Sequence, residues 1–247
     1  MNTPMTDSAA QLEILLEDGP VLAVNKPAGL LTLGAIPGVP TLERQVKEYL
    51  KARFQKPGNV YLGIPHRLDR PVSGVMVFAR NSKAAARLAE QFRDRQVQKT
   101  YWAVVERAVE EPEGELVDWL LKTPDQARVE VVAPDTPGAR EARLRYRTIG
   151  AEGRLLEIEL LTGRMHQIRV QLASQGLPIM GDVQYGAKEP LSFGGSTDSR
   201  DWPIGLHARQ LTILHPVRYD RVSITAPLPA WWDRFGVPPA SGAASAP

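Results

Sequence analysis

The sequence predicts an α+β fold, and three observations lead to it. Short apolar runs typical of strands outnumber the helical patterns. Turn signals such as Pro57-Gly58-Asn59 separate these runs at short intervals, and no linker or internal repeat divides the chain. Many strands with few helices favour a mixed, largely antiparallel sheet with flanking helices and loops. A chain of 247 residues, 43% of them hydrophobic, can bury the core of one such domain.

The first expected elements are a strand and a helix. Residues 21–24 form a short apolar run, and residues 25–29 are expected to form a turn because proline and glycine interrupt a strand ladder. Thr41 is expected to open a helix whose apolar side chains recur at helical spacing: Leu42, Val46, Tyr49 and Leu50.

A second strand and helix follow in the same order. Residues 74–79 form a continuous apolar run, and Ser82 is expected to cap the next helix. The side chains expected to pack that helix on the strand are Ala85, Leu88, Ala89 and Phe92.

The remainder of the chain is rich in expected strands. Residues 164–174 should form a helix that Gly176 ends, since glycine readily adopts the left-handed conformation found there. The small, polar or proline-rich segments 1–10 and 236–247 are expected to be disordered, which leaves 11–235 as the folded domain. The strands are expected over 101–105, 115–121, 127–132, 142–149, 154–161, 205–214 and 221–226.

Composition excludes several classes of chemistry. The absence of cysteine excludes disulfides, thiolate metal sites and cysteine nucleophiles, and fits a reducing cytoplasm. No targeting or membrane-spanning pattern is found, so a soluble protein is expected. The net charge is only +2, but one segment is locally basic and is either a phosphate-binding surface or a set of solvated helix faces. Its residues are Arg67, Arg70, Arg80, Lys83, Arg87, Arg93, Arg95 and Lys99.

The segment from His66 to Gly74 carries the most chemical information. It places Asp69 on a loop between two arginines. A nearby guanidinium can keep a carboxylate ionised in a dry pocket, where it can act as nucleophile or base. An ordinary turn aspartate is the more common case, and the loop alone leaves both interpretations open.

Three other kinds of site do not fit. A protein-kinase loop would need its aspartate directly after the arginine and an asparagine five residues later, where this chain has Gly74. No phosphate-binding P-loop is present. The four histidines lack metal-ligand spacing, and no metal site is expected; they are His66, His166, His207 and His215.

Five motifs, in order, resemble those of RluA-type pseudouridine synthases, which isomerise uridine to pseudouridine in RNA. They span most of residues 20–215, and the resemblance implies the pseudouridine synthase fold with an active-site cleft. The motifs are VNKPAGLLT (24–32), HRLDRPVSG (66–74), KTYWAVV (99–105), LTGRMHQIRVQLA (161–173) and PIMGDVQYGA (178–187).

The resemblance implies three catalytic residues and no cofactor. Asp69 matches the essential aspartate, and Arg169 matches its basic partner, so the two are expected to form a buried pair. Tyr101 matches a tyrosine that can stack on the uracil and assist proton transfer. Because the isomerisation is neither a redox reaction nor a group transfer to another molecule, it requires no cofactor.

The resemblance also implies RNA contacts. Arg67 matches an arginine that enters the base stack when the uridine is extruded, although it could equally brace its loop. His166 and Gln167 either fix the loop or touch RNA, with the structural role favoured, and Asp182 and Tyr185 are expected to be scaffold. The remaining candidate RNA contacts are His66, Arg164 and Lys26.

Two departures from the family pattern affect these expectations. Pro71 and Val72 replace residues common in relatives, and they are expected to shape the loop without supplying its reactive group. Asp69 lies too near the start for an additional amino-terminal RNA-binding domain, so the catalytic domain itself is expected to bind the RNA. The expected substrate is an rRNA or a tRNA, and the expected state is a cytoplasmic monomer. The alternatives are a non-catalytic RNA-binding protein and a hydrolase that releases uracil.

Overall fold

The structure is built on one mixed sheet. The computed structural model describes residues 12–34, 38–150, 152–191 and 202–237. Within them ten strands pair in the order β1-β2-β3-β9-β4-β8-β7-β5-β6, and β10 pairs with β9. All pairs are antiparallel except β3 with β9, so the predicted α+β class is confirmed. The strands are β1 (Glu13–Asp18), β2 (Val21–Lys26), β3 (Ser73–Ala79), β4 (Gln98–Val104), β5 (Glu113–Lys122), β6 (Val129–Val132), β7 (Arg140–Thr148), β8 (Leu155–Leu160), β9 (Leu206–Leu214) and β10 (Arg221–Thr225).

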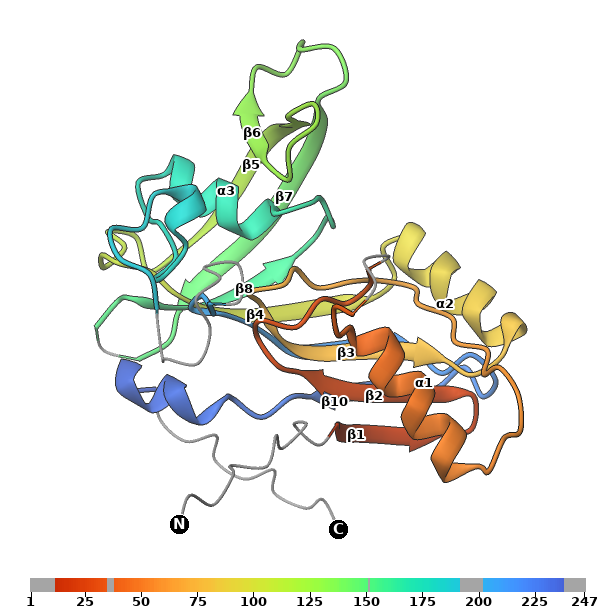
Figure 1. Cartoon of the computed structure of the whole chain (residues 1–247). Coiled ribbons are helices and arrows are strands. Elements are labelled where there is room, and N and C mark those ends of the chain that lie inside the picture. The colour runs from red at the N-terminus through yellow and green to blue at the C-terminus, as the bar shows by residue number, and fades with distance from the viewer. Residues whose placement is uncertain (1–11, 35–37, 151, 192–201, 238–247) are drawn as a thin grey trace, which may run out of the picture.

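The helices lie at two places on this sheet (Figure 1). Helices α1 (Leu42–Arg53) and α2 (Ser82–Arg93) pack at the end that holds β1 to β3, whereas α3 (Gln167–Ser174) packs beside β5 and β6. Two short 3-10 helices complete the described elements, η1 (Val183–Tyr185) and η3 (Ala230–Phe235).

Several predicted boundaries were wrong. Asn81, not Ser82, caps α2, because its side-chain oxygen accepts the Ala84 N–H at 2.8 Å. The predicted helix over 164–174 begins only at Gln167, since the backbone of His166 is left-handed with φ 50°. The inward face of α2 is also rotated from the expected one: Ala89 is exposed, and the buried side chains are Ala84, Leu88 and Gln91.

The first two strands also differ from expectation. Strand β1 was not predicted, and β2 continues through Lys26, so the expected turn begins later than residue 25. At the far end of the chain, Val237 is 7% exposed and packs with Trp232, so the folded domain extends beyond residue 235. The disorder predicted for 1–10 and for 238–247 lies outside the described residues.

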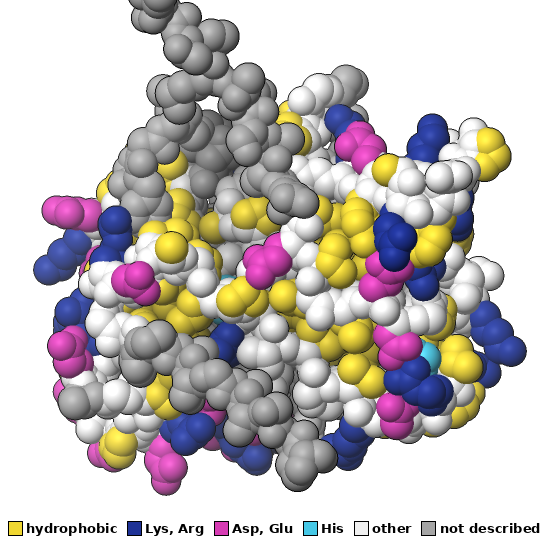
Figure 2. Space-filling view, turned by 90° about the horizontal axis from the view of Figure 1, so that it is seen from below, with side chains coloured by type: hydrophobic (Ala, Val, Ile, Leu, Met, Phe, Trp, Pro, Cys, Tyr) yellow, Lys and Arg dark blue, Asp and Glu magenta, His cyan; other side chains and the backbone are white. Residues whose placement is uncertain are grey.

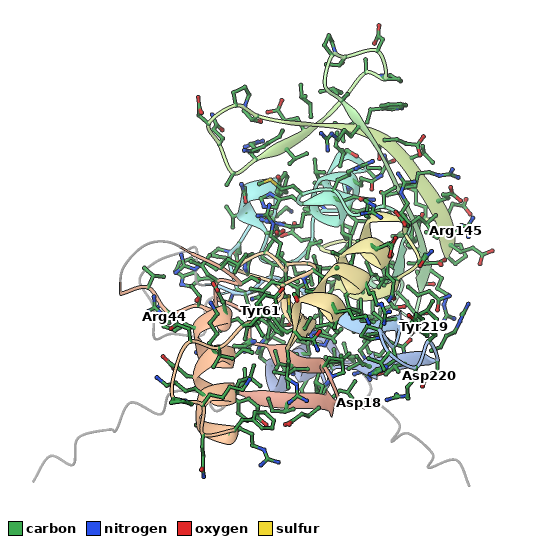
Figure 3. The ribbon with its side chains drawn as sticks, turned by 90° about the vertical axis from the view of Figure 1, so that its right-hand side faces the viewer. Asp18, Arg44, Tyr61, Arg145, Tyr219 and Asp220 are labelled. Carbon is green, nitrogen blue, oxygen red and sulfur yellow. The ribbon has the colours of Figure 1, made fainter. Side chains whose placement is uncertain are left out.

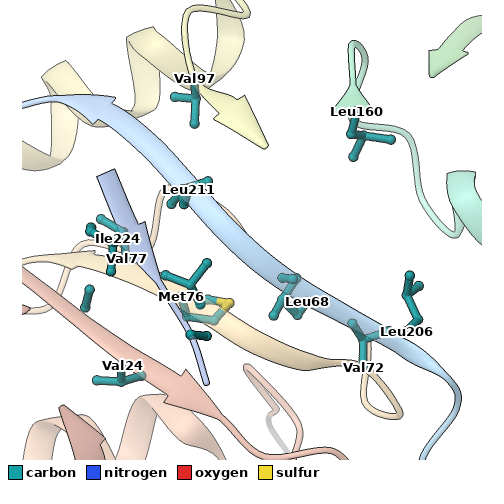
Figure 4. Close-up of a cluster of buried hydrophobic side chains, with 14 of the residues drawn as sticks. Val24, Leu68, Val72, Met76, Val77, Val97, Leu160, Leu206, Leu211 and Ile224 are labelled. Atoms are coloured by element: carbon teal, nitrogen blue, oxygen red, sulfur yellow. The ribbon is translucent and has the colours of Figure 1, made fainter. Parts of the chain in front are cut away.

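The main core extends to the loop that precedes β3. Figure 4 shows side chains of β2, β3, β9 and β10 packed together with Leu68 and Val72. Both loop side chains are buried, and Asp69 lies between them in sequence. The hydrophobic core therefore fixes the loop on each side of the aspartate.

Gly74 allows this loop to enter the sheet. Its φ is +123°, and a Cβ atom there would overlap the backbone of Ala208 in β9. Only glycine combines that dihedral with so close an approach. The parallel contact between β3 and β9 begins at this point, with Ser73 opposite His207 and Gly74 opposite Ala208.

Charges of both signs are mixed on the outer surface. Asp18, Tyr219 and Asp220 gather at one end of the sheet (Figure 3), where Arg218 pairs with both aspartates. The face in Figure 2 shows basic and acidic side chains interspersed, with hydrophobic side chains between them. In the described part of the chain, no helix is both long and apolar enough to cross a bilayer.

Candidate active site

Residues 26–32 hold the Asp69 loop from one side. The Thr32 hydroxyl donates to the Leu68 carbonyl at 2.8 Å, and Gly29 N–H donates to the Arg70 carbonyl at 2.8 Å. Arg70 Nε donates in return to the Gly29 carbonyl at 3.1 Å. The two residues that flank Asp69 therefore have fixed backbones, which limits the positions its carboxylate can take.

Lys26 is part of this support and not an RNA contact. Its side chain is fully buried, and Nζ donates to the carbonyls of Pro27 at 2.8 Å and Arg70 at 3.2 Å. Burial lowers its pKa to about 7, while the charge of Asp69 works against that shift. The prediction of an RNA contact at Lys26 is wrong, because RNA cannot reach an enclosed amine.

Asp69 meets the side chain of Arg169, as predicted. Arg169 Nη1 lies 3.5 Å from Asp69 Oδ2, and His166 Nε2 lies 3.6 Å from the same oxygen. No described residue donates a hydrogen bond to Oδ1. The Asp69 side chain is 27% exposed, so the pair is only partly buried, which corrects the prediction of a buried pair.

The nearest partner of Arg169 is Asp182. Arg169 donates Nε and Nη2 to the two carboxylate oxygens of Asp182 at 2.7 and 2.8 Å, and Nη2 also donates to Gln184 Oε1 at 2.9 Å. Burial opposes the charge on Arg169, but the Asp182 carboxylate and then Asp69 raise its pKa. Asp182 thus anchors the guanidinium while Nη1 stays directed at Asp69.

Tyr101 lines the same cleft as Asp69. Burial raises the pKa of the Tyr101 hydroxyl, and the charge of Asp69 raises it further. The hydroxyl therefore stays protonated at neutral pH, where it can donate but cannot act as a base.

The cleft has a volume of about 620 Å³, a size typical of sites for small molecules and therefore sufficient for a nucleotide. It holds every candidate site residue except Lys26. They are His66, Arg67, Asp69, Tyr101, Arg164, His166, Gln167 and Arg169.

Two of these residues have structural contacts that leave little for RNA. His66 stacks on Phe92 with ring centroids 4.5 Å apart, and its Nε2 accepts the Val77 N–H at 3.0 Å. Gln167 is 2% exposed and hydrogen-bonds Thr162, Arg143 and Gln171. The prediction that Gln167 contacts RNA is wrong, and its favoured structural role agrees with these bonds.

Basic side chains line the rim of the cleft. Arg67 and Arg95 are exposed, and Arg164 is partly buried. Burial and then the charge of Arg95 lower the pKa of Lys99 to about 8. Neither Arg95 nor Lys99 forms an ion pair within the described segments. These cations give the mouth of the cleft a locally positive charge.

The expected basic segment is therefore divided by the fold. Arg80 pairs with Glu17, and Arg87 stacks over Tyr219 and donates to the Pro216 carbonyl, both away from the cleft lining. Sequence proximity grouped these arginines with Arg95, but only the folded chain shows which of them share a surface. No cluster of three or more potential metal ligands occurs among the residues that the structure describes.

Known proteins resemble the chain in both sequence and structure. The model of the RNA pseudouridylate synthase family matches residues 20–174. Ribosomal large subunit pseudouridine synthase D of Xylella fastidiosa is 38% identical over 91% of this chain and 69% of its own length. The tRNA pseudouridine synthase C of Vibrio parahaemolyticus is 31% identical over 91% of this chain and 94% of its own.

The structural comparison agrees. Human RNA Pseudouridylate Synthase Domain Containing 4 superposes with a TM-score of 0.72 at 28% identity, covering 90% of each chain. The family match and the named relatives, together with this fold, define the class of protein as an enzyme that isomerises uridine in RNA. The chain belongs to the RNA pseudouridylate synthase family, in its RluA-type branch.

Proposed function

We propose that this enzyme converts one or more uridines of a structured rRNA or tRNA to pseudouridine, with Asp69 as the reacting carboxylate. The observation that carries the proposal is the position of Asp69: one oxygen faces Arg169 and His166, and the other has no donor among the described residues. Relatives named for large-subunit rRNA and for tRNA both align over most of the chain, which supports these two substrate classes.

The reaction rearranges one nucleotide. The bond between ribose and the uracil nitrogen breaks, the base turns, and ribose bonds to carbon 5 of the ring. Carbon 5 then loses its proton and the freed ring nitrogen takes one up, so the product is an isomer of the substrate. Asp69 either attacks the nucleotide or removes a sugar proton to form a glycal, and both routes need the ionised carboxylate. Tyr101, which stays protonated, is proposed to stack on the uracil and donate a proton or a hydrogen bond.

The target base must leave its stack to reach Asp69. Unstacking costs a few kcal/mol, which an inserted side chain can offset. Arg67 is exposed and lines the cleft, so we assign it to this step. Arg95, Lys99 and Arg164 are proposed to bind the flanking phosphates, and the enzyme is proposed to act as a cytoplasmic monomer.

Pseudouridine mapping tests the proposal. RNA from cells lacking the gene should lose at least one site, and wild type but not Asp69→Ala should restore it. No lost site in rRNA or tRNA would contradict the proposed substrates. Rescue of every phenotype of the deletion strain by Asp69→Ala would support the non-catalytic alternative, while free uracil released in a purified assay would indicate hydrolysis.

A further inference from the structure

A chain of three hydrogen-bonding groups leads from β6 to the catalytic loop. The Val129 N–H donates to the Tyr185 hydroxyl oxygen at 3.0 Å. That oxygen lies 2.8 Å from His166 Nδ1, and the two rings meet edge to face. His166 Nε2 then lies 3.6 Å from Asp69 Oδ2.

The first contact favours one direction for the second. Because the Tyr185 oxygen already accepts from Val129, its own proton needs an acceptor, and His166 Nδ1 is the one that the described residues provide. Burial lowers the pKa of His166 against the effect of Asp69, and burial raises the pKa of Tyr185, so both shifts favour a neutral imidazole and a protonated phenol at neutral pH. With Nδ1 as the acceptor, a neutral imidazole carries its proton on Nε2, the nitrogen that faces Asp69 Oδ2.

The backbone conformation of His166 is consistent with a ring whose Nε2 faces Asp69. Its φ of 50° is uncommon for a residue with a side chain, and it ends the preceding loop directly before α3. The His166 side chain is only 9% exposed, which leaves the ring little freedom to turn.

We propose that Tyr185 and His166 are positioning residues that hold the catalytic carboxylate in one orientation. Tyr185 selects the imidazole tautomer with the proton on Nε2, and that N–H and Arg169 Nη1 both approach Asp69 Oδ2. Oδ1 is thereby turned toward the cleft, where the nucleotide reacts. This role goes beyond scaffolding, and it rests on the proposed function of Asp69.

The first test separates positioning from binding. Tyr185→Phe removes only the hydroxyl. We expect kcat on a target RNA to fall about tenfold or more, because the variant loses a hydrogen bond that helps to orient the charged carboxylate. KM should change less than about twofold. Tyr49→Phe is the matched control, because it removes a tyrosine hydroxyl that donates to Glu17 at 2.8 Å outside the cleft. An unchanged kcat in Tyr185→Phe would overturn the proposal.

Replacing His166 tests which ring nitrogen matters. The amide of a glutamine at this position can place an N–H near the site of Nε2, whereas the shorter asparagine amide reaches only the site of Nδ1. His166→Gln should therefore retain more kcat than His166→Asn. The reverse order would contradict a donor role for Nε2.

A third test needs neither activity nor a stable variant. Nitrogen-15 spectra of the histidine-labelled wild-type enzyme should show His166 with a bare Nδ1 and a protonated Nε2. His66 provides an internal reference of the opposite tautomer, since its Nε2 accepts from Val77. A proton on Nδ1 of His166 would overturn the inference even in an active enzyme. An inactive wild type with the expected tautomer would instead count against the proposed function.

Discussion

At the scale of single residues, the surroundings of Asp69 combine cations of very different exposure. Lys26 is enclosed behind the loop, Arg169 is buried beside it, and Arg67 is exposed at the cleft. Buried cations need partners, and both buried cations have them. Lys26 donates to backbone carbonyls, and Arg169 pairs with the carboxylate of Asp182. Of these three cations, only Arg67 is exposed enough to exchange its solvent contacts for RNA.

Lys26 should make stability depend on pH. Its pKa is about 7 in the folded chain and close to 10.5 when exposed, so between these values the unfolded chain binds more protons. Its contribution to the free energy of unfolding therefore rises with pH across this window and levels off below pH 7. Urea unfolding from about pH 7 to about pH 10 should show wild type gaining stability relative to Lys26→Met. Parallel curves for the two proteins would show that Lys26 titrates normally.

Asp182 should matter more to folding than other aspartates paired with arginine. Its side chain is 1% exposed, so Asp182→Asn leaves the buried Arg169 charge without its main partner. We expect a loss of about 3 kcal/mol in the free energy of unfolding, together with reduced activity. The matched control is Asp220→Asn, which removes an exposed partner of Arg218 and should change stability little. Equal effects of the two substitutions would refute the anchoring role.

At the scale of elements, the catalytic loop is fixed where it enters β3. Gly74→Ala would push against the Ala208 backbone and strain a positive φ. We expect a loss of at least about 3 kcal/mol in the free energy of unfolding. Gly58→Ala is the control, because a Cβ there meets no atom within 4 Å. A Gly74→Ala enzyme of normal stability would mean that the β3–β9 contact can relax.

The sequence predicted elements well where a local pattern decides them. Thr41 caps α1 as expected, with its oxygen accepting the Arg44 N–H, and the apolar run before α2 is a buried strand. The start of α3 could not be predicted, because His166 is held in a left-handed conformation among contacts to Tyr185 and Asp69 from other parts of the chain. Such contacts leave no periodic signal.

The candidate active site was predictable only in part from the sequence. The motifs brought Asp69, Tyr101 and Arg169 to one cleft, and the structure places all three there. They did not show that Asp182 is the closer partner of Arg169 or that Lys26 is enclosed. Both facts depend on how distant segments pack around the loop.

At the scale of the whole molecule, RNA affinity should depend on the cleft rim more than on net charge. Each phosphate contact contributes about 0.7 to 0.9 to the slope of log affinity against log salt. Replacing Arg67 and Arg95 with glutamine should therefore reduce that slope by about 1.5. Replacing Arg145 and Arg147, which pair with Glu115 and Glu157, is the matched control and should change it little. Equal slopes for both double variants would place the RNA elsewhere.

The proposed chemistry requires the Asp69 carboxylate to perform the isomerisation inside an otherwise intact cleft. The decisive experiment is single-turnover pseudouridine formation by purified wild type and Asp69→Asn on the same mapped RNA, with RNA affinity measured in parallel. Asparagine keeps the shape of the side chain but cannot attack or remove a proton. We expect the variant to bind RNA within a few-fold of wild type and to form no pseudouridine above background. Pseudouridine formed by Asp69→Asn at a rate near that of wild type would show that another group reacts.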